Sequence, residues 1–286
     1  MDTFKYYKPQ NIQEAFNIIQ QEGGSVRFLA GGTDLLVRLK SRHIVPDAVV
    51  DLKAIDDINQ GIRMDEQTVT IGSLTTFSEV DTNPIILQHF PALAEAASEV
   101  GSVQIRNRAT IGGNICNASP AADSLPPLFI YDAKVKLMRK DSTRVIPISA
   151  FLLGPGKTAL EKGELLAGLV LPIPAPGQAA SFTRLTRRRG ADLATINLCC
   201  QVHRGGLTRF AVGAAAPVPF IVEDPSGLLS DPNGDPEAKR ALVQELMQAA
   251  SPITDVRASR EYRQAMVVSL ALRALGNALQ SLGGQA

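Results

Sequence analysis

Alternating apolar and polar residues predict β-strands in both halves of the chain. The clearest case runs from Ala194 to Val202, where every second residue is apolar or a thiol, as expected for a strand with one buried face. The segment from Thr208 to Ala215 should pair with it across a turn at Gly205 and Gly206. Further strands are expected at Val26 to Leu29, Val49 to Leu52, Thr68 to Ile71, Ala133 to Leu137 and Leu165 to Leu171.

Apolar residues at helical spacing predict helices between these strands. Thr75 or Thr76 is a suitable N-cap for a helix that carries Phe77 and Val80. Pro126 and Pro127 are expected to end the element before the strand at Ala133. Other helices are expected at Asn11 to Gln21, Asp34 to Lys40, Pro91 to Val100, Glu237 to Ala250 and Ser259 to Leu282. The mixture of helices and sheets indicates an α+β protein.

The length of the chain predicts more than one domain. At 286 residues it exceeds the usual size of a single core. The one linker-like stretch is PIPAPG, from Pro172 to Gly177, and we place the domain boundary there, giving domains at 1–176 and 177–286.

Composition and charge exclude several classes of partner. The chain is 45% hydrophobic and 20% charged, with a formal net charge of +1, which gives no reason to expect binding to nucleic acid or to a membrane surface. The N-terminus lacks the apolar core of a signal peptide, and no apolar run reaches the length of a membrane span. We therefore expect a cytoplasmic protein without membrane insertion.

The cysteines and histidines do not predict a metal site in this chain. Cys116, Cys199 and Cys200 have no CxxC spacing. The histidines at 43, 89 and 203 are scattered and form no HxxxH or HExxH motif. We expect Cys116 to be a small buried thiol, and any metal chemistry to belong to another protein.

The first glycine loop is LAGGTDL, from Leu29 to Leu35. Glycine lets a ligand approach the main chain closely, and consecutive amide groups can then hold an anion such as a pyrophosphate. The amides of Gly31, Gly32, Thr33 and Asp34 are expected to do so here, with the Thr33 hydroxyl as an extra donor.

The second glycine loop is TIGGNICNASPAAD, from Thr110 to Asp123. Its amides at Gly112 and Gly113 are expected to form a similar pocket, and Asn114, Ser119 and Asp123 supply side chains suited to the hydroxyls of a sugar or ribityl chain. Neither loop has the GxGxxG pattern of a Rossmann nucleotide site. Together the loops predict a large cofactor held from two places.

These motifs, in this order, resemble the flavin-binding medium subunits of the molybdenum hydroxylases, the family of xanthine dehydrogenase and carbon monoxide dehydrogenase. The resemblance covers essentially the whole chain. It rests on LAGGTDL at Leu29, RNRATIGGNICNASPAAD at Arg106, ELL at Glu164 and FTRLTRRRGADLA at Phe182.

The resemblance implies both a fold and a cofactor. The fold would be a two-lobed FAD-binding domain of the vanillyl-alcohol-oxidase type, with lobes at about 1–55 and 56–176, followed by a smaller α+β domain with an antiparallel sheet and helices. Carried over by position, the residues expected to bind FAD are Arg27, Phe28, Leu29, Ala30, Gly31, Gly32, Thr33, Asp34, Leu35, Thr110, Ile111, Gly112, Gly113, Asn114, Ser119, Asp123, Leu165, Leu166 and Arg184. Leu165 and Leu166 would lie near the adenine, and Arg184 near the isoalloxazine, where a lysine is common in relatives.

The resemblance also implies partners. A large subunit would hold the molybdenum cofactor and hydroxylate the substrate, a small subunit would hold two 2Fe–2S clusters, and the assembly would be a dimer of heterotrimers. Electrons would leave through this chain's FAD to NAD, a quinone, a ferredoxin or oxygen, so no catalytic residue is expected here. Arg187, Arg188 and Arg189 are either a solvated basic turn or a site that attracts an anionic acceptor.

Thr33 and Asp34 stand where the carbon monoxide enzymes of this family favour a different pair, which favours the xanthine or N-heterocycle branch. Leu193 stands where some relatives, including carbon monoxide dehydrogenases, carry a tyrosine against the flavin ring. A carbon monoxide or aldehyde dehydrogenase subunit remains an alternative. From other classes, a self-sufficient flavin oxidase and a flavin-free assembly subunit also stay open.

Overall fold

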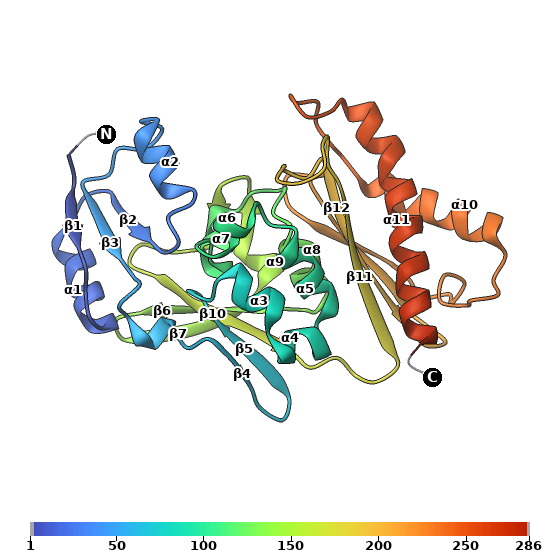
Figure 1. The fold of residues 1–286 in the computed structure, drawn as a ribbon, viewed down its shortest axis with the longest axis horizontal. Helices are drawn as coiled ribbons and strands as arrows, with labels where there is room; N and C mark the ends of the chain where they lie inside the picture. The colour runs from blue at the N-terminus through green and yellow to red at the C-terminus, as the bar shows by residue number, and fades with distance from the viewer. Residues whose placement is uncertain (1–2, 285–286) are drawn as a thin grey trace.

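The chain folds around three main sheets that follow one another along the long axis of the molecule (Figure 1). The structure is a computed structural model, and it describes residues 3–284. The order in space follows the order in sequence, from the N-terminal sheet through a helix-covered central sheet to the C-terminal sheet.

The first sheet is parallel, in the order β1 (Lys5–Tyr7), β3 (Ala48–Asp51), β2 (Val26–Leu29). Helix α1 (Ile12–Gln21) makes the crossover that parallel strands require, and the Asn11 side chain caps it by accepting from the amide of Glu14. Helix α2 (Leu35–Lys40) follows β2 after the first glycine loop, and the short helix η1 (Asp56–Ile58) leads to the central sheet.

The central sheet is antiparallel. Its order is β4 (Ile62–Met64), β5 (Thr68–Gly72), β10 (Leu165–Pro172), β6 (Lys134–Arg139), β7 (Ser142–Pro147). Seven short helices and a two-stranded ribbon connect these strands: α3 (Phe77–Thr82), α4 (Pro84–His89), α5 (Pro91–Ser98), α6 (Val103–Arg106), α7 (Ile111–Asn117), α8 (Leu125–Ile130), α9 (Ile148–Phe151), β8 (Leu152–Gly154) and β9 (Lys157–Thr158). Because β10 lies in the middle of the sheet, its apolar run is almost entirely buried.

The C-terminal sheet is antiparallel in sequence order: β11 (Gln178–Leu185), β12 (Ile196–His203), β13 (Thr208–Gly213) and β14 (Phe220–Asp224). Helices α10 (Pro236–Leu246), η2 (Met247–Ala249) and α11 (Arg260–Gly283) complete this part. Figure 1 shows α11 running across β11 and β12.

Helix α11 is long and apolar enough to cross a membrane by length and composition, the one such helix within residues 3–284. Its apolar side is already covered, because Val267, Leu270, Ala271 and Leu275 share a core cluster with Ile196 and Leu198 of β12. We therefore assign α11 to the protein core. The expectation that no apolar run reaches the length of a membrane span is wrong for this helix by length and composition.

The structure confirms the α+β class and most of the expected elements. Thr76 forms the capping box of α3 with Glu79, and Gly205 has a left-handed φ of 71° in the turn between β12 and β13. The expectation for Pro126 and Pro127 is wrong: both prolines lie inside α8, in its first turn, where proline's missing N–H needs no partner. The strand expected from Ala194 begins at Ile196, since a loop occupies the preceding positions.

Strand β12 also differs from the half-buried strand that its alternation predicted. Residues Ile196 to Val202 are all buried. Helix α11 packs on one side of the strand, and α8 also contacts it, with Cys199 in the core cluster of the central part and Cys200 in that of the C-terminal part. The polar residues of the alternating pattern, including Asn197, are therefore buried against other parts of the protein.

Candidate functional site

A cavity of about 610 Å³ lies where the N-terminal part meets the central sheet. Its walls come mainly from three stretches of sequence, between residues 24 and 38, 109 and 117, and 156 and 166. Ser73 and Leu74 after β5 also line it, as do Ile19, Ile44 and Leu52. Its size falls within the range of small-molecule and cofactor sites. Both glycine loops contribute to the wall, as the sequence predicted that they would act together.

The two glycine loops touch through their main chains. A β carbon on Gly31 would lie 1.9 Å from the carbonyl oxygen of Arg108, just before the second loop. A β carbon on Gly112 would lie 2.6 Å from the carbonyl oxygen of Ser73. Neither position has room for a side chain. At position 32 the backbone itself favours glycine, because its φ of 79° lies in the left-handed region.

The first loop presents main-chain amides that have no hydrogen-bond partner among the described residues. The amides of Gly31, Gly32, Thr33 and Asp34 donate no hydrogen bond to any group of the described residues 3–284. All four residues line the cavity. Amide groups without an internal acceptor need a ligand or water, and consecutive ones form a concave donor site for an anion.

The amides of the second loop are already engaged, so the expectation of a second anion pocket is wrong. The amide of Ile111 donates to the Thr75 carbonyl at 2.9 Å, and that of Gly112 donates to the Ser73 carbonyl at 3.0 Å. The amide of Gly113 donates to Oγ1 of Thr110, the N-cap of α7, at 3.1 Å. Instead, the second loop lets a ligand come close to its main chain at Gly112 and Gly113, and it adds Thr110 and Asn114 to the cavity wall.

Ser73 is a lining residue that the sequence analysis missed. Its side chain is buried, and its Oγ has no hydrogen-bond partner among the described residues. A buried hydroxyl without a partner is unusual, and at the cavity wall it can bind a ligand atom. Serine after a strand is common, so no pattern in the sequence distinguished it.

The structure brings most of the expected FAD ligands to the cavity wall and leaves the others away from it. The residues on the wall are Arg27, Phe28, Ala30, Gly31, Gly32, Thr33, Asp34, Leu35, Thr110, Gly112, Gly113, Asn114, Leu165 and Leu166. The residues off the wall are Leu29, Ile111, Ser119, Asp123 and Arg184.

Asp123 and Arg184 form a buried ion pair. Arg184 Nη1 donates to Asp123 Oδ2 at 2.8 Å, and the two side chains are 9% and 8% exposed. Burial raises the pKa of Asp123 to about 6, which outweighs the opposite effect of Arg184. Arg184 also contacts Glu99 at 2.7 Å.

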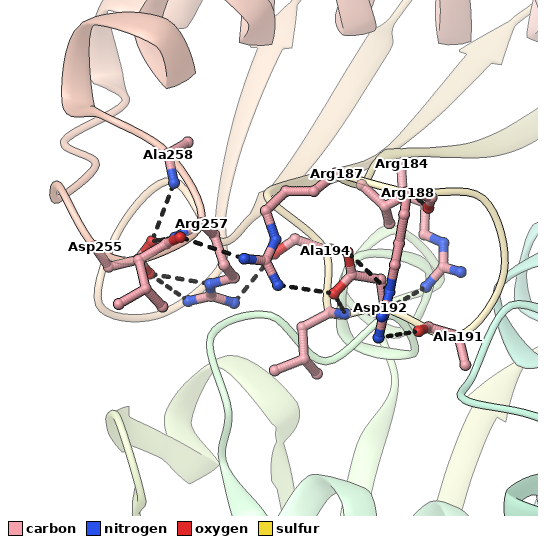
Figure 2. A network of polar contacts seen from close by, with 12 residues as sticks. Arg184, Arg187, Arg188, Ala191, Asp192, Ala194, Asp255, Arg257 and Ala258 are labelled. Atoms are coloured by element: carbon pink, nitrogen blue, oxygen red, sulfur yellow. Dashed lines mark hydrogen bonds and ion pairs between the residues drawn. The ribbon is translucent and has the colours of Figure 1, made fainter.

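The basic turn that follows β11 is braced by its own arginines (Figure 2). Arg187 donates to Asp192 at 3.4 Å and to the Val256 carbonyl at 3.3 Å. Arg188 donates to the Ala191 carbonyl at 3.0 Å. Within residues 3–284, Arg189 has no ion pair or side-chain hydrogen bond. Arg187 and Arg188 therefore have partners within the turn and its surroundings, whereas Arg189 has none in the part of the chain that the structure describes.

No cluster of metal-binding side chains occurs in the part of the chain that the structure describes. Cys116 lines the cavity, and burial raises the pKa of its thiol to about 12, so the thiol stays protonated. The lining carboxylates of Asp34, Glu161 and Glu164 are bound by Asn117, Arg139 and Arg144, respectively.

Comparison with known proteins decides the family. The protein-family model described as "FAD binding domain in molybdopterin dehydrogenase" matches residues 2–174, which is more than half of the chain. The chain belongs to this family of molybdenum hydroxylase flavin subunits. A second model, "CO dehydrogenase flavoprotein C-terminal domain", matches residues 181–278.

Relatives of the flavin subunits match over nearly the full length. The xanthine dehydrogenase FAD-binding subunit of Escherichia coli is 30% identical over 99% of both chains. The carbon monoxide dehydrogenase medium chain of Hydrogenophaga pseudoflava is 31% identical over 96% of both. The structure of reconstituted carbon monoxide dehydrogenase from Oligotropha carboxidovorans has a TM-score of 0.90 at 26% identity, covering 98% of both chains.

These matches confirm the family, the fold and the presence of an FAD-binding domain that the sequence predicted. The cavity fits an adenine dinucleotide in the kinds of groups that it offers. Gly31 to Asp34 supply free donors for a pyrophosphate, Ser73 and Thr110 supply hydroxyls, and Leu165 and Leu166 supply an apolar wall.

Proposed function

We propose that this cavity holds FAD and that the chain relays electrons from iron–sulfur clusters of a partner subunit to an external acceptor. The observation that carries the proposal is the run of unpartnered amides from Gly31 to Asp34 on the cavity wall. A neutral donor set of this kind suits a pyrophosphate, which is the central group of FAD.

Each part of the site has a separate task in this proposal. The amides and the Thr33 hydroxyl hold the pyrophosphate, Leu165 and Leu166 pack against the adenine, and Thr110 and Asn114 with Ser73 hydrogen-bond to hydroxyls of the ribityl chain or ribose. Arg27, Phe28, Ala30 and Leu35, with Gly112 and Gly113, shape the wall. Leu29, Ile111, Ser119, Asp123 and Arg184 lie off the cavity wall and belong to the proposed FAD site through the family resemblance, with Arg184 toward the isoalloxazine end.

When bound, FAD accepts electrons singly or in pairs and passes them on. The protein's part is to bind and orient it. No unpartnered carboxylate lines the cavity within the described residues: Asp34, Glu161 and Glu164 are bound by other side chains, and Cys116 is a protonated thiol. This disfavours a self-sufficient flavin oxidase, which needs its own base.

The partners follow from the family. We propose a large subunit with the molybdenum cofactor and a small subunit with two 2Fe–2S clusters, assembled in the cytoplasm as a dimer of heterotrimers. The names of the two relatives, a "FAD-binding subunit" and a "medium chain", support a role within a complex. The acceptor is NAD, a quinone, a ferredoxin or oxygen.

For the substrate we propose xanthine or another N-heterocycle, hydroxylated on the large subunit. The xanthine dehydrogenase relative covers 99% of the chain, and Leu193 stands where some relatives carry a tyrosine. Carbon monoxide is the second candidate, favoured by the similarity to carbon monoxide dehydrogenases in sequence and structure.

The test is to purify the chain alone and together with its partner subunits, and to record the visible spectrum and metal content of each. We expect flavin that stays oxidised when substrate is added to the chain alone and is reduced when the partners are present. Reduction of the isolated chain by an organic substrate would instead identify an oxidase. A complex that contains no flavin would overturn the FAD site.

A further inference from the structure

Two side chains of the C-terminal sheet hold both oxygens of the Asp123 carboxylate. Arg184 Nη1 donates to Oδ2 at 2.8 Å, and Asn197 Nδ2 donates to Oδ1 at 2.9 Å. Asn197 is fully buried. Buried polar groups of this kind fix the geometry of what they bind, because no water can replace a lost partner.

The strand register brings these two donors together. Arg184 on β11 and Asn197 on β12 are cross-strand partners, so their side chains lie on the same face of the sheet. The next partner, on β13, is Gly213, where a β carbon would lie 2.1 Å from Asn197 Oδ1. The absence of a side chain at Gly213 makes the space that the Asn197 amide occupies.

The oxygen of the Asn197 amide has no hydrogen-bond partner among the described residues, although it is buried. Its nitrogen donates to Asp123 and, at 3.4 Å, to the Ala121 carbonyl. An apolar residue would avoid the unpartnered oxygen. The hydrogen bond that Asn197 Nδ2 donates to Asp123 therefore explains why this buried position holds an asparagine.

The segment that contains Asp123 connects this pair to the cavity. Ser124 Oγ donates to Asn114 Oδ1 at 2.7 Å, and Asn114 lines the cavity. At the other end of the segment, the amide of Ala214 donates to the Pro120 carbonyl at 2.7 Å. Residues 120–124 are thus held between the C-terminal sheet and the cavity wall.

We propose that Asn197 is a positioning residue for the flavin site: with Arg184 it fixes Asp123 and the adjoining Ser124, and so sets the orientation of the Asn114 amide at the cavity. This inference rests on the proposed FAD site. Loss of the Asn197 donor leaves Asp123 Oδ1 buried with no donor, and the segment must move to satisfy it.

The test uses the full chain purified with its partner subunits. Asn197→Ala removes the donor, and Gly213→Ala displaces the amide while Asn197 itself is kept. Gln201→Ala is the matched control, because Gln201 is a buried amide on the same face of β12 that donates to Gln178 and does not line the cavity. The readouts are the flavin-to-protein ratio, the FAD dissociation constant and the unfolding temperature by circular dichroism.

We expect Asn197→Ala and Gly213→Ala to raise the FAD dissociation constant about tenfold, as for a lost hydrogen bond to a charged group. Gln201→Ala should leave that constant close to the wild-type value even if it lowers the unfolding temperature. Wild-type FAD affinity in both Asn197→Ala and Gly213→Ala would overturn the positioning role and leave the FAD site standing. A wild-type complex without flavin would overturn both.

A second substitution at Asn197 separates positioning from simple loss of stability. Asn197→Asp places a carboxylate beside Asp123, in a site that also contains Arg184 and, beyond it, Glu99. Two neighbouring carboxylates repel when both are charged, but a protonated one can donate to the other. FAD affinity of Asn197→Asp should therefore approach that of the wild type as the pH is lowered. A constant ratio between the two proteins at all pH values would contradict the proposal.

Discussion

Asn117 at the end of α7 donates a hydrogen bond to the carboxylate of Asp34 at 3.4 Å, across 83 positions of sequence. This bond joins the two glycine loops through side chains, whereas Gly31 and Arg108 join them through the main chain. The wall of the cavity is therefore one connected unit, although its residues come from distant segments. A change in either loop should affect the other.

Gly31→Ala should disrupt this junction. The new methyl group would lie 1.9 Å from the Arg108 carbonyl oxygen, and relief of that clash should cost about 1–3 kcal/mol and lower the flavin content. Gly206→Ala is the control, since a β carbon there has open space. Flavin titration and thermal unfolding measure both effects, and full flavin binding by Gly31→Ala would show that the loops do not need this contact.

Arg263→Ala should be among the most destabilising changes in the C-terminal part. Arg263 is 1% exposed and donates to the carbonyls of Thr195 and Ala214 and to the Asp255 carboxylate. Its loss leaves the Thr195 and Ala214 carbonyls without this donor and removes one donor from Asp255, which Arg257 also binds. The expected cost is about 3–5 kcal/mol. Arg260→Ala, at an exposed position one turn earlier, should change stability little. Chemical denaturation compares the two.

Because of Asp123, the free energy of unfolding should decrease as the pH rises across the weakly acidic range. Burial raises its pKa from 3.8 to about 6, so the folded state holds the proton more tightly than the unfolded state does. The resulting contribution is fully present below 3.8 and is lost as the pH passes about 6. The difference in unfolding free energy between wild type and Asp123→Asn, measured by urea titration across this range, should change in that direction. A flat difference would mean that Asp123 stays ionised.

Arg189 should affect electron delivery to an anionic acceptor. It is the arginine of the basic turn without an internal partner in the described part of the chain. If the acceptor is NAD, Arg189→Ala should lower kcat/KM for NAD several-fold, with a smaller effect at high salt. Arg273→Ala makes the same change in net charge at an exposed position of α11 and should have no effect. Equal effects of the two would exclude local steering.

The sequence was most informative where a single residue type has a single structural use. The first glycine pair predicted main chain that a ligand can approach, and Gly31 and Gly32 do line the cavity. The packing of Gly31 against the Arg108 carbonyl and the left-handed φ of Gly32 are further reasons for glycine that the structure adds. The sequence was less informative where the answer depends on distant partners. The amides of Gly112 and Gly113 resemble those of the first loop in sequence, but acceptors at Ser73 and Thr110 take them.

The burial of Asn197 likewise depends on residues that are distant in the sequence. Its place in an alternating pattern predicted a polar residue on an exposed face. Whether that face meets solvent or protein depends on how α8 and the preceding segment pack on the sheet, and on the register that pairs Asn197 with Arg184. Neither is encoded in the local sequence.

The reliance of the first loop on main-chain donors has a consequence for how charge is distributed over this protein. Amides can bind an anion without a salt bridge, so the proposed pyrophosphate site does not need Arg189, and the cations that line the cavity are Arg27, Arg38 and Lys162. An unpaired arginine such as Arg189 is then available for a molecule that must arrive and leave within each turnover. In this proposal the main-chain amides hold the bound cofactor, and the side-chain charge of Arg189 attracts the electron acceptor.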